Sequence, residues 1–412
     1  MAGTWKQLHS LKVADMGTKK TLLLILVLLI VWLLGNSLLR DNLGSSIRLF
    51  NDDSDWKNYF SDGAYFLKGQ VPYKDTLSEY PQIPTYLFAV PYLLFRPSSG
   101  EAFNFRLYTS VFSFIMIGVL FGTISLLYNM LQTHKDRAFL LLLPAGLYFS
   151  YNRFDILPSF LVLLSLFLLQ RKKNLLVGII LGIATLTKWY PALLLPIFLA
   201  YIYHTQRRID WKMFLAFCLT CLVILAPTLL LGGLKAVLVP YTFHAERGFE
   251  YVSLPAILRI ISHLWFRASL NTTLISYLFL VLSILPVPFI ILAHVDTFDK
   301  VIHWSVLVVA AFIIFSRIWS PQWILWVLPL LILMARTPAD VAWIVTYTVV
   351  DYLAFPLLFD LIGPISWTLI VASLAVFTIL LRFAIIAYRR SDGMQLQLFA
   401  LPRAGRGEKR GN

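Results

Sequence analysis

Acids and bases that could carry out chemistry recur in this sequence beside long apolar runs. Three acids lie close together after the first run, in the cluster DDSD: Asp52, Asp53 and Asp55. Six more ionisable residues come from segments far apart along the chain: Asp155, Lys188, His244, Arg247, Glu250 and Arg317. Phosphate groups bind Arg, Lys or His, and a hydroxyl nucleophile needs a carboxylate to take its proton. The set therefore suits a reaction between a phosphate-bearing substrate and a hydroxyl.

The elements that must position these residues are membrane-spanning helices. The 412-residue chain is 59% hydrophobic and 14% charged, whereas about 25% of residues are charged in soluble proteins. Apolar runs that can cross a bilayer as helices recur along its whole length. We therefore predict an all-α polytopic membrane protein. Because charge is costly in hydrocarbon, the ionisable residues at helix ends are functional candidates, and the phosphate is expected on a lipid.

The apolar runs predict twelve spans in one transmembrane domain over residues 1–388. A basic tail over residues 389–412 is expected to be disordered. The spans are expected near residues 21–39, 105–131, 138–151, 155–169, 175–187, 189–203, 213–231, 272–293, 301–316, 321–335, 339–358 and 364–388.

The orientation depends on the short apolar segment 83–95, which has 13 residues and several neighbouring prolines. If this segment lies on the membrane surface, the termini and the basic clusters all fall on one side. Those clusters are 135–137, 171–173, 207–212 and 389–390. We therefore expect a multi-pass protein of the cell membrane with cytoplasmic termini and two long outer segments, 40–104 and 232–271.

The first outer segment is expected to begin with a helix at the membrane surface. Its aromatic and aliphatic residues recur at helical spacing, whereas its polar residues share another face. The apolar face consists of Trp56, Tyr59, Phe60 and Leu67, and the polar face of Asp55, Asn58 and Asp62. The acids after the first span would then form a polar shelf at the outer surface.

Structural roles are alternatives for individual candidates. Asp52 and Asp53 could cap the surface helix or face solvent. Lys188, Arg317 and Arg153 could extend to lipid headgroups, as isolated cations at helix ends often do.

Several classes of function lack their minimum parts. The chain has no GxxxxGK[ST] or GxGxxG phosphate loop, no HExxH and no Cys/His metal spacing, which argues against a nucleotide-driven pump or a metalloprotease. Lys and Arg occur in short clusters between apolar runs, as topology signals do, so no nucleic-acid partner is expected. The DDSD carboxylates could bind a divalent ion, but we predict neither a metal nor another cofactor.

Six ordered sequence blocks resemble the polyprenyl-phosphate-mannose-dependent α-mannosyltransferases of glycosyltransferase family 87, in the GT-C fold class. They run from about residue 50 to residue 330, in the order found in the family. They read DWKNYFSDGAYFLKGQVPYKD, EYP, RFDILPS, KWYPALLLPIFL, FHAERGFEYVSL and SRIWSPQWILWVLPLL.

The resemblance implies a helical bundle with two interfacial helices in the first outer loop, which also favours the surface placement of 83–95. By the D-x-x-x-Y match, it implies that Asp55 is the catalytic base, with Asp52 and Asp53 as rivals. The implied partners are a polyprenyl-phosphate sugar, a glycan or glycolipid acceptor and the lipid bilayer. The sugar would move by inverting displacement on the outer face.

Type and motif position suggest roles for the remaining residues. Lys188, His244, Arg247 and Arg317 would hold the leaving phosphate, whereas Glu79, Asp155, Glu250 and Trp319 would orient sugars. Two other functions remain open. A transporter or flippase would place its ionisable residues near the bilayer midplane on paired broken helices, and an inactive scaffold of a cell-envelope glycan assembly could retain the same fold.

Overall fold

The computed structural model describes residues 53–94, 101–267, 270–363 and 366–391. Regular structure in these ranges is helical, apart from a single bridge between Pro72 and Thr76. The predicted all-α membrane fold is therefore confirmed. The expected span 21–39 and the tail from residue 392 onward lie outside the described residues, as does Asp52.

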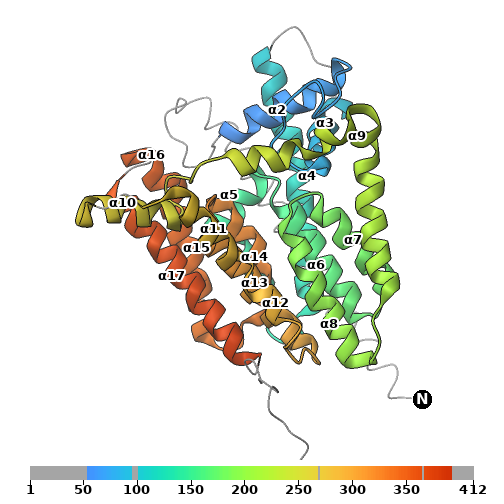
Figure 1. Cartoon of the computed structure of the whole chain (residues 1–412), viewed down its shortest axis with the longest axis vertical. Helices are drawn as coiled ribbons and strands as arrows, with labels where there is room; N and C mark the ends of the chain where they lie inside the picture. The colour runs from blue at the N-terminus through green and yellow to red at the C-terminus, as the bar shows by residue number, and fades with distance from the viewer. Residues whose placement is uncertain (1–52, 95–100, 268–269, 364–365, 392–412) are drawn as a thin grey trace, which may run out of the picture.

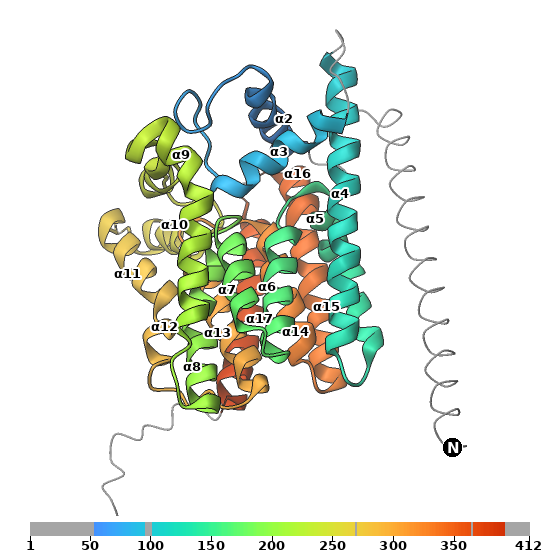
Figure 2. The ribbon, with the colours of Figure 1, turned by 90° about the vertical axis from the view of Figure 1, so that its right-hand side faces the viewer.

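Most of the helices run side by side in a bundle (Figures 1 and 2). Its members are α4 (Glu101–Met130), α5 (Pro144–Asn152), α6 (Ile156–Gln170), α7 (Asn174–Thr185), α8 (Leu195–Gln206), α9 (Trp211–Glu246), α11 (Thr272–Ile284), α12 (Pro286–Phe289), α13 (Phe298–Phe315), α14 (Ile324–Met334), α15 (Pro338–Tyr352) and α17 (Trp367–Arg390). Helices α13 and α14 are buried along most of their length, so they form the centre of the protein.

The count of twelve spans is not confirmed. Within the described ranges, six helices are long and apolar enough to cross a membrane, and a seventh crossing results if α5 and α6 count as one bent span. Several expected spans are instead short or interrupted. A 3₁₀ helix (Lys135–Leu142) precedes α5, two others precede α8 and α14 (Tyr190–Leu194 and Pro321–Trp323), and a π-helical turn (Leu353–Leu358) follows α15.

The first outer segment forms two helices that lie across one end of the bundle, α2 (Ser54–Leu67) and α3 (Gln82–Leu94) (Figure 2). Helix α3 corresponds to the expected surface segment 83–95. The aromatic face of α2, however, is turned into the protein and not toward lipid. Tyr59 is fully buried and stacks on Phe88 of α3 with ring centroids 4.3 Å apart, and it also packs against Phe112 and Phe154.

The second outer segment crosses the same end of the bundle. Helix α9 breaks at Gly233, whose φ of 70° is readily adopted only by glycine. Beyond this break the chain leaves the long axis of α9 and leads toward α10 (Leu254–Phe266) (Figure 1). The segment 232–271, which the sequence predicts as a long loop, is therefore largely helical in the structure.

The opposite end of the bundle gathers the basic clusters. Arg137, after α4, donates to the carbonyl oxygen of Ala335. Arg390 donates to the carbonyl oxygen of Met334 and pairs with Asp340 at 2.9 Å. Because α17 continues through Arg390, the first two residues of the expected tail are helical.

The close approach of α2 and α3 predicts that Gly63→Ala will destabilise the protein. A β carbon at Gly63 would lie 2.1 Å from the carbonyl oxygen of Phe88. Relieving this overlap should cost about 1–3 kcal/mol, which a lower midpoint of thermal unfolding of the purified protein would report. Gly118→Ala in α4 is the control, because no heavy atom lies within 4 Å of its β carbon. Equal midpoints for the two variants would contradict the packing.

Candidate active site

A cavity of about 940 Å³ lies at the end of the bundle that carries α2 and α3. Its walls come from segments far apart in the sequence: the start of α2, the loop before α3, the linker from α9 to α10, helix α11, and the stretch from α13 to α14. The residues predicted from sequence that line it are Asp55, Glu79, Lys188, His244, Arg247, Glu250, Arg317 and Trp319. The structure therefore brings most of the candidates together.

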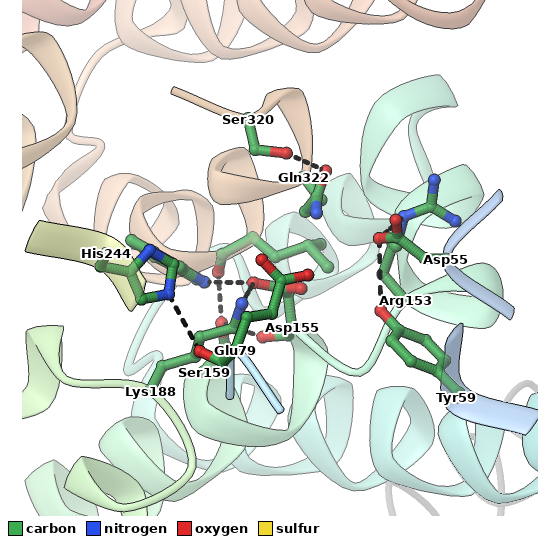
Figure 3. A network of polar contacts seen from close by, with 12 residues as sticks. Asp55, Tyr59, Glu79, Arg153, Asp155, Ser159, Lys188, His244, Ser320 and Gln322 are labelled. Atoms are coloured by element: carbon green, nitrogen blue, oxygen red, sulfur yellow. Dashed lines mark hydrogen bonds and ion pairs between the residues drawn. The ribbon is translucent and has the colours of Figure 1, made fainter. Parts of the chain in front are cut away.

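Asp55 lies in the first turn of α2 and is held through one carboxylate oxygen. Arg153 Nε lies 2.7 Å from Asp55 Oδ2, and the Tyr59 hydroxyl donates to the same oxygen at 3.3 Å (Figure 3). No hydrogen bond or ion pair joins Oδ1 to a described residue. This oxygen is therefore available to a ligand.

The rival aspartates stand apart from this arrangement. Asp53 precedes α2, pairs with Lys57 one turn later at 3.2 Å, and is absent from the cavity lining. Asp52 lies outside the described residues. Within the described ranges, no group of three or more His, Cys, Asp or Glu side chains could hold a metal ion.

A polar junction joins the two outer segments at the cavity wall. Arg247 donates to Glu79 at 3.1 Å and to Glu250 at 2.8 Å. His244 Nε2 lies 2.9 Å from the carbonyl oxygen of Glu79 and must donate, since a carbonyl oxygen can only accept. The charge of Arg247 is therefore already balanced by carboxylates.

Arg317 completes this junction from the segment between α13 and α14. Its Nη2 donates to the carbonyl oxygens of His244 and Ala245, and its own carbonyl accepts from the Glu250 backbone amide at 3.1 Å. No described carboxylate pairs with its guanidinium. Among the described residues, Arg317 is therefore a cavity-lining cation without a carboxylate partner.

Lys188 forms another part of the wall and pairs with Asp155 behind it. The Lys188 ammonium lies 3.6 Å from Asp155 Oδ1, and the Trp326 indole donates to the same oxygen at 2.8 Å. Aromatic rings surround the ammonium, with centroid distances of 4.6 Å to Phe154 and 5.3 Å to Tyr80. Asp155 is fully buried and is not part of the lining, so it contacts the cavity wall through Lys188 and Trp326, which both line the cavity.

Another part of the cavity lining is apolar and comes largely from α11 and α13. We call this part the apolar arm; its residues are Tyr277, Leu280, Phe312, Phe315, Phe355 and Leu369. Trp319 lies in the same stretch as Arg317, but it is almost entirely buried, with its ring packed edge-on against Phe377. The cavity therefore combines a charged part with a hydrocarbon-lined part.

Arg153 is the cavity residue whose importance the sequence did not reveal. It was expected to extend to lipid headgroups, yet its side chain is 2% exposed and pairs with Asp55. The available signal was its position in the block RFD, two residues before Asp155 and between two short apolar runs. Spacing alone did not identify its partner, which lies almost a hundred residues earlier.

The link between α2 and the loop that carries Glu79 should depend on pH. The Ser78 hydroxyl donates to Asp62 at 3.1 Å. Burial raises the pKa of the Asp62 carboxyl from an ordinary value of 3.8 to about 6. Folding therefore favours protonated Asp62. The resulting contribution to the stability of the folded protein is complete below the ordinary Asp pKa of 3.8, and it is lost as the pH rises through about 6.

We predict that backbone amides in residues 62–79 exchange hydrogen more slowly as the pH falls from about 7 to about 5, once rates are corrected for intrinsic exchange. Asp62→Asn should remove this pH dependence, because the amide cannot ionise. Protection that increases with pH in the wild-type protein would contradict the prediction.

Comparison with protein-family models matches residues 80–321 to glycosyltransferase family 87. The match covers more than half of the chain and includes the cavity residues from Lys188 to Trp319, whereas Asp55 and Glu79 precede it. Comparison with curated proteins finds no match.

Proposed function

Since this chain belongs to glycosyltransferase family 87, we propose that it transfers a sugar from a polyprenyl phosphate to an acceptor hydroxyl by inverting displacement. The observation that carries the proposal is that Asp55 and Arg317 line one cavity. A carboxylate with a free oxygen can act as a base there, and a cation without an anionic partner can receive a phosphate.

Asp55 is the proposed general base. Its Oδ1 accepts the proton of the acceptor hydroxyl while the hydroxyl oxygen bonds to the anomeric carbon. The bond from that carbon to the phosphate oxygen breaks on the opposite side, and polyprenyl phosphate leaves with the bonding electrons. Because one carboxylate suffices for a single displacement, the second acid of a retaining mechanism is not required.

Arg317 is the proposed main ligand of the leaving phosphate. Negative charge grows on the phosphate oxygens as the glycosidic bond breaks, and a preorganised cation stabilises it. Lys188, Arg247 and His244 also line the cavity, but Lys188 and Arg247 are already paired with carboxylates. These three residues would assist the phosphate at the cost of weakening existing contacts.

The proposed sugar-orienting residues differ in how they can act. Glu79 and Glu250 line the cavity and could accept hydrogen bonds from sugar hydroxyls. Asp155 would act through Lys188, because it is buried behind that residue. Trp319 would shape the wall from its buried position beside Phe377.

The apolar arm along α11 is the proposed path of the isoprenoid tail. Tyr277 and Leu280 of α11 and Phe312 and Phe315 of α13 all line the cavity. Hydrocarbon burial stabilises a lipid there by about 25 cal/mol per Å² of apolar surface. A donor that lies in this arm would have its phosphate near the charged part of the cavity.

We propose that the cavity opens on the non-cytoplasmic face of the cell membrane. In support, the basic clusters 135–137 and 389–390 lie at the opposite end of the bundle, and such clusters favour the cytoplasmic side. Mannose is the proposed sugar because the sequence blocks resemble mannosyltransferases. The proposed acceptor is a glycan or glycolipid.

The base assignment predicts that Asp55→Asn and Asp53→Asn differ sharply. Purified full-length protein would be supplied with radiolabelled polyprenyl-phosphate mannose and a membrane glycolipid extract, and labelled product would be measured. Loss of the base should lower the transfer rate at least about 100-fold. Asp53→Asn should change it by about twofold or less, because Asp53 faces Lys57 outside the cavity.

Loss of transfer in the Asp53 variant alone would show that the base is misassigned. Movement of the labelled lipid across vesicles without transfer would support a flippase, the competing function. The absence of both transfer and movement in the wild-type protein would support an inactive scaffold.

A further inference from the structure

We propose that Arg153 is a positioning residue, which holds Asp55 so that Oδ1 faces the cavity. This inference rests on the proposed function, since it concerns the orientation of the proposed base. It gives Arg153 a role in turnover and none in binding the donor.

The contacts of Asp55 separate its two carboxylate oxygens. Oδ2 lies 2.7 Å from Arg153 Nε and accepts the Tyr59 hydroxyl at 3.3 Å. Figure 3 shows both contacts at the same carboxylate oxygen. The two oxygens of a carboxylate are equivalent, so a half-turn restores the same contacts, whereas any smaller rotation would lengthen both; the pair therefore selects one orientation of the carboxylate plane.

The backbone around Arg153 makes this anchor rigid. Arg153 ends α5 with extended dihedral angles, φ −132° and ψ 152°, and the axes of α5 and α6 meet at 107°. The neighbouring residues Asn152 and Phe154 are fully buried. The guanidinium also donates to the carbonyl oxygen of Asn152 at 3.1 Å, so the side chain is fixed both at its base and near its tip.

The same break positions the opposite part of the site. Asp155, two residues after Arg153, contacts Lys188 and Trp326, and the ring of Phe154 lies 4.6 Å from the Lys188 ammonium. Three consecutive residues therefore fix the base on one side and a cavity cation on the other. A helix without the break would direct successive side chains about 100° apart around one axis.

A direct role in phosphate binding is the alternative, because Arg153 also lines the cavity. The two roles differ in kinetics. Removal of a residue that binds the phosphate in the ground state lowers donor affinity, whereas removal of a residue that orients the base raises the free energy of the transition state. Donor KM and kcat therefore distinguish them.

The test compares Arg153→Gln and Arg153→Lys in the full-length protein, with polyprenyl-phosphate mannose as the varied substrate. Misplacement of a reacting group by about 1 Å costs about 100-fold in rate, so we expect Arg153→Gln to lower kcat by about that factor with donor KM nearly unchanged. Arg153→Lys should recover part of kcat, because an ammonium can still pair with Oδ2. In the Asp55→Asn background, Arg153→Gln should cause little further loss.

Lys57→Gln is the matched control. Lys57 lies on α2, as Asp55 does, and it pairs with Asp53, but its side chain is 66% exposed. This substitution should leave kcat and KM unchanged. An unchanged kcat in Arg153→Gln would overturn the proposal, as would a large rise in donor KM at constant kcat. If Arg153→Gln folds poorly, Arg153→Lys provides the test. A kcat equal to that of the wild type, together with a much higher donor KM, would overturn the proposal. Absence of transfer by the wild-type protein would instead refute the proposed function.

Discussion

Hydrocarbon solvates charge poorly, and this constraint determines where the ionisable side chains of the protein can lie. A charged group within a bilayer needs a partner, a route to water or a place at the end of a helix. The described helices meet this requirement by gathering acids and cations around one cavity at one end of the bundle. Arg153 with Asp55, Lys188 with Asp155, and Arg247 with Glu79 and Glu250 are the resulting pairs.

This pairing gives the cavity its chemical character. Buried charges that already have partners maintain geometry more than they attract ligands, because a ligand must compete with an existing contact. Arg317 differs, since it is held by carbonyl oxygens and keeps its positive charge uncompensated by any described carboxylate. Asp55 likewise keeps one oxygen that has no hydrogen bond or ion pair to the described residues. The two groups best suited to receive an anion and a proton are thus those that the surrounding network leaves available.

The sequence predicted those parts of the structure that depend on local pattern. Apolar runs identified the helical segments, the short proline-flanked segment forms α3 across one end of the bundle, and charged positions at helix ends identified most of the charged residues that line the cavity. Pairing between distant segments could not be predicted. The contact between Arg153 and Asp55 depends on a 107° bend between α5 and α6, and a bend of this kind has no counterpart in hydrophobic periodicity. For the same reason, α2 was expected to lie at the membrane surface through its aromatic face, although α3 and α4 cover that face with protein.

The central claim is that base and phosphate ligand share one cavity, and a cryo-EM structure of the full-length protein with bound polyprenyl phosphate tests it most directly. We predict that the phosphate lies within hydrogen-bond distance of Arg317, in the cavity that Asp55 lines, with the isoprenoid along α11. A phosphate bound at the basic end of the bundle, or separated from Asp55 by closed protein, would contradict the claim.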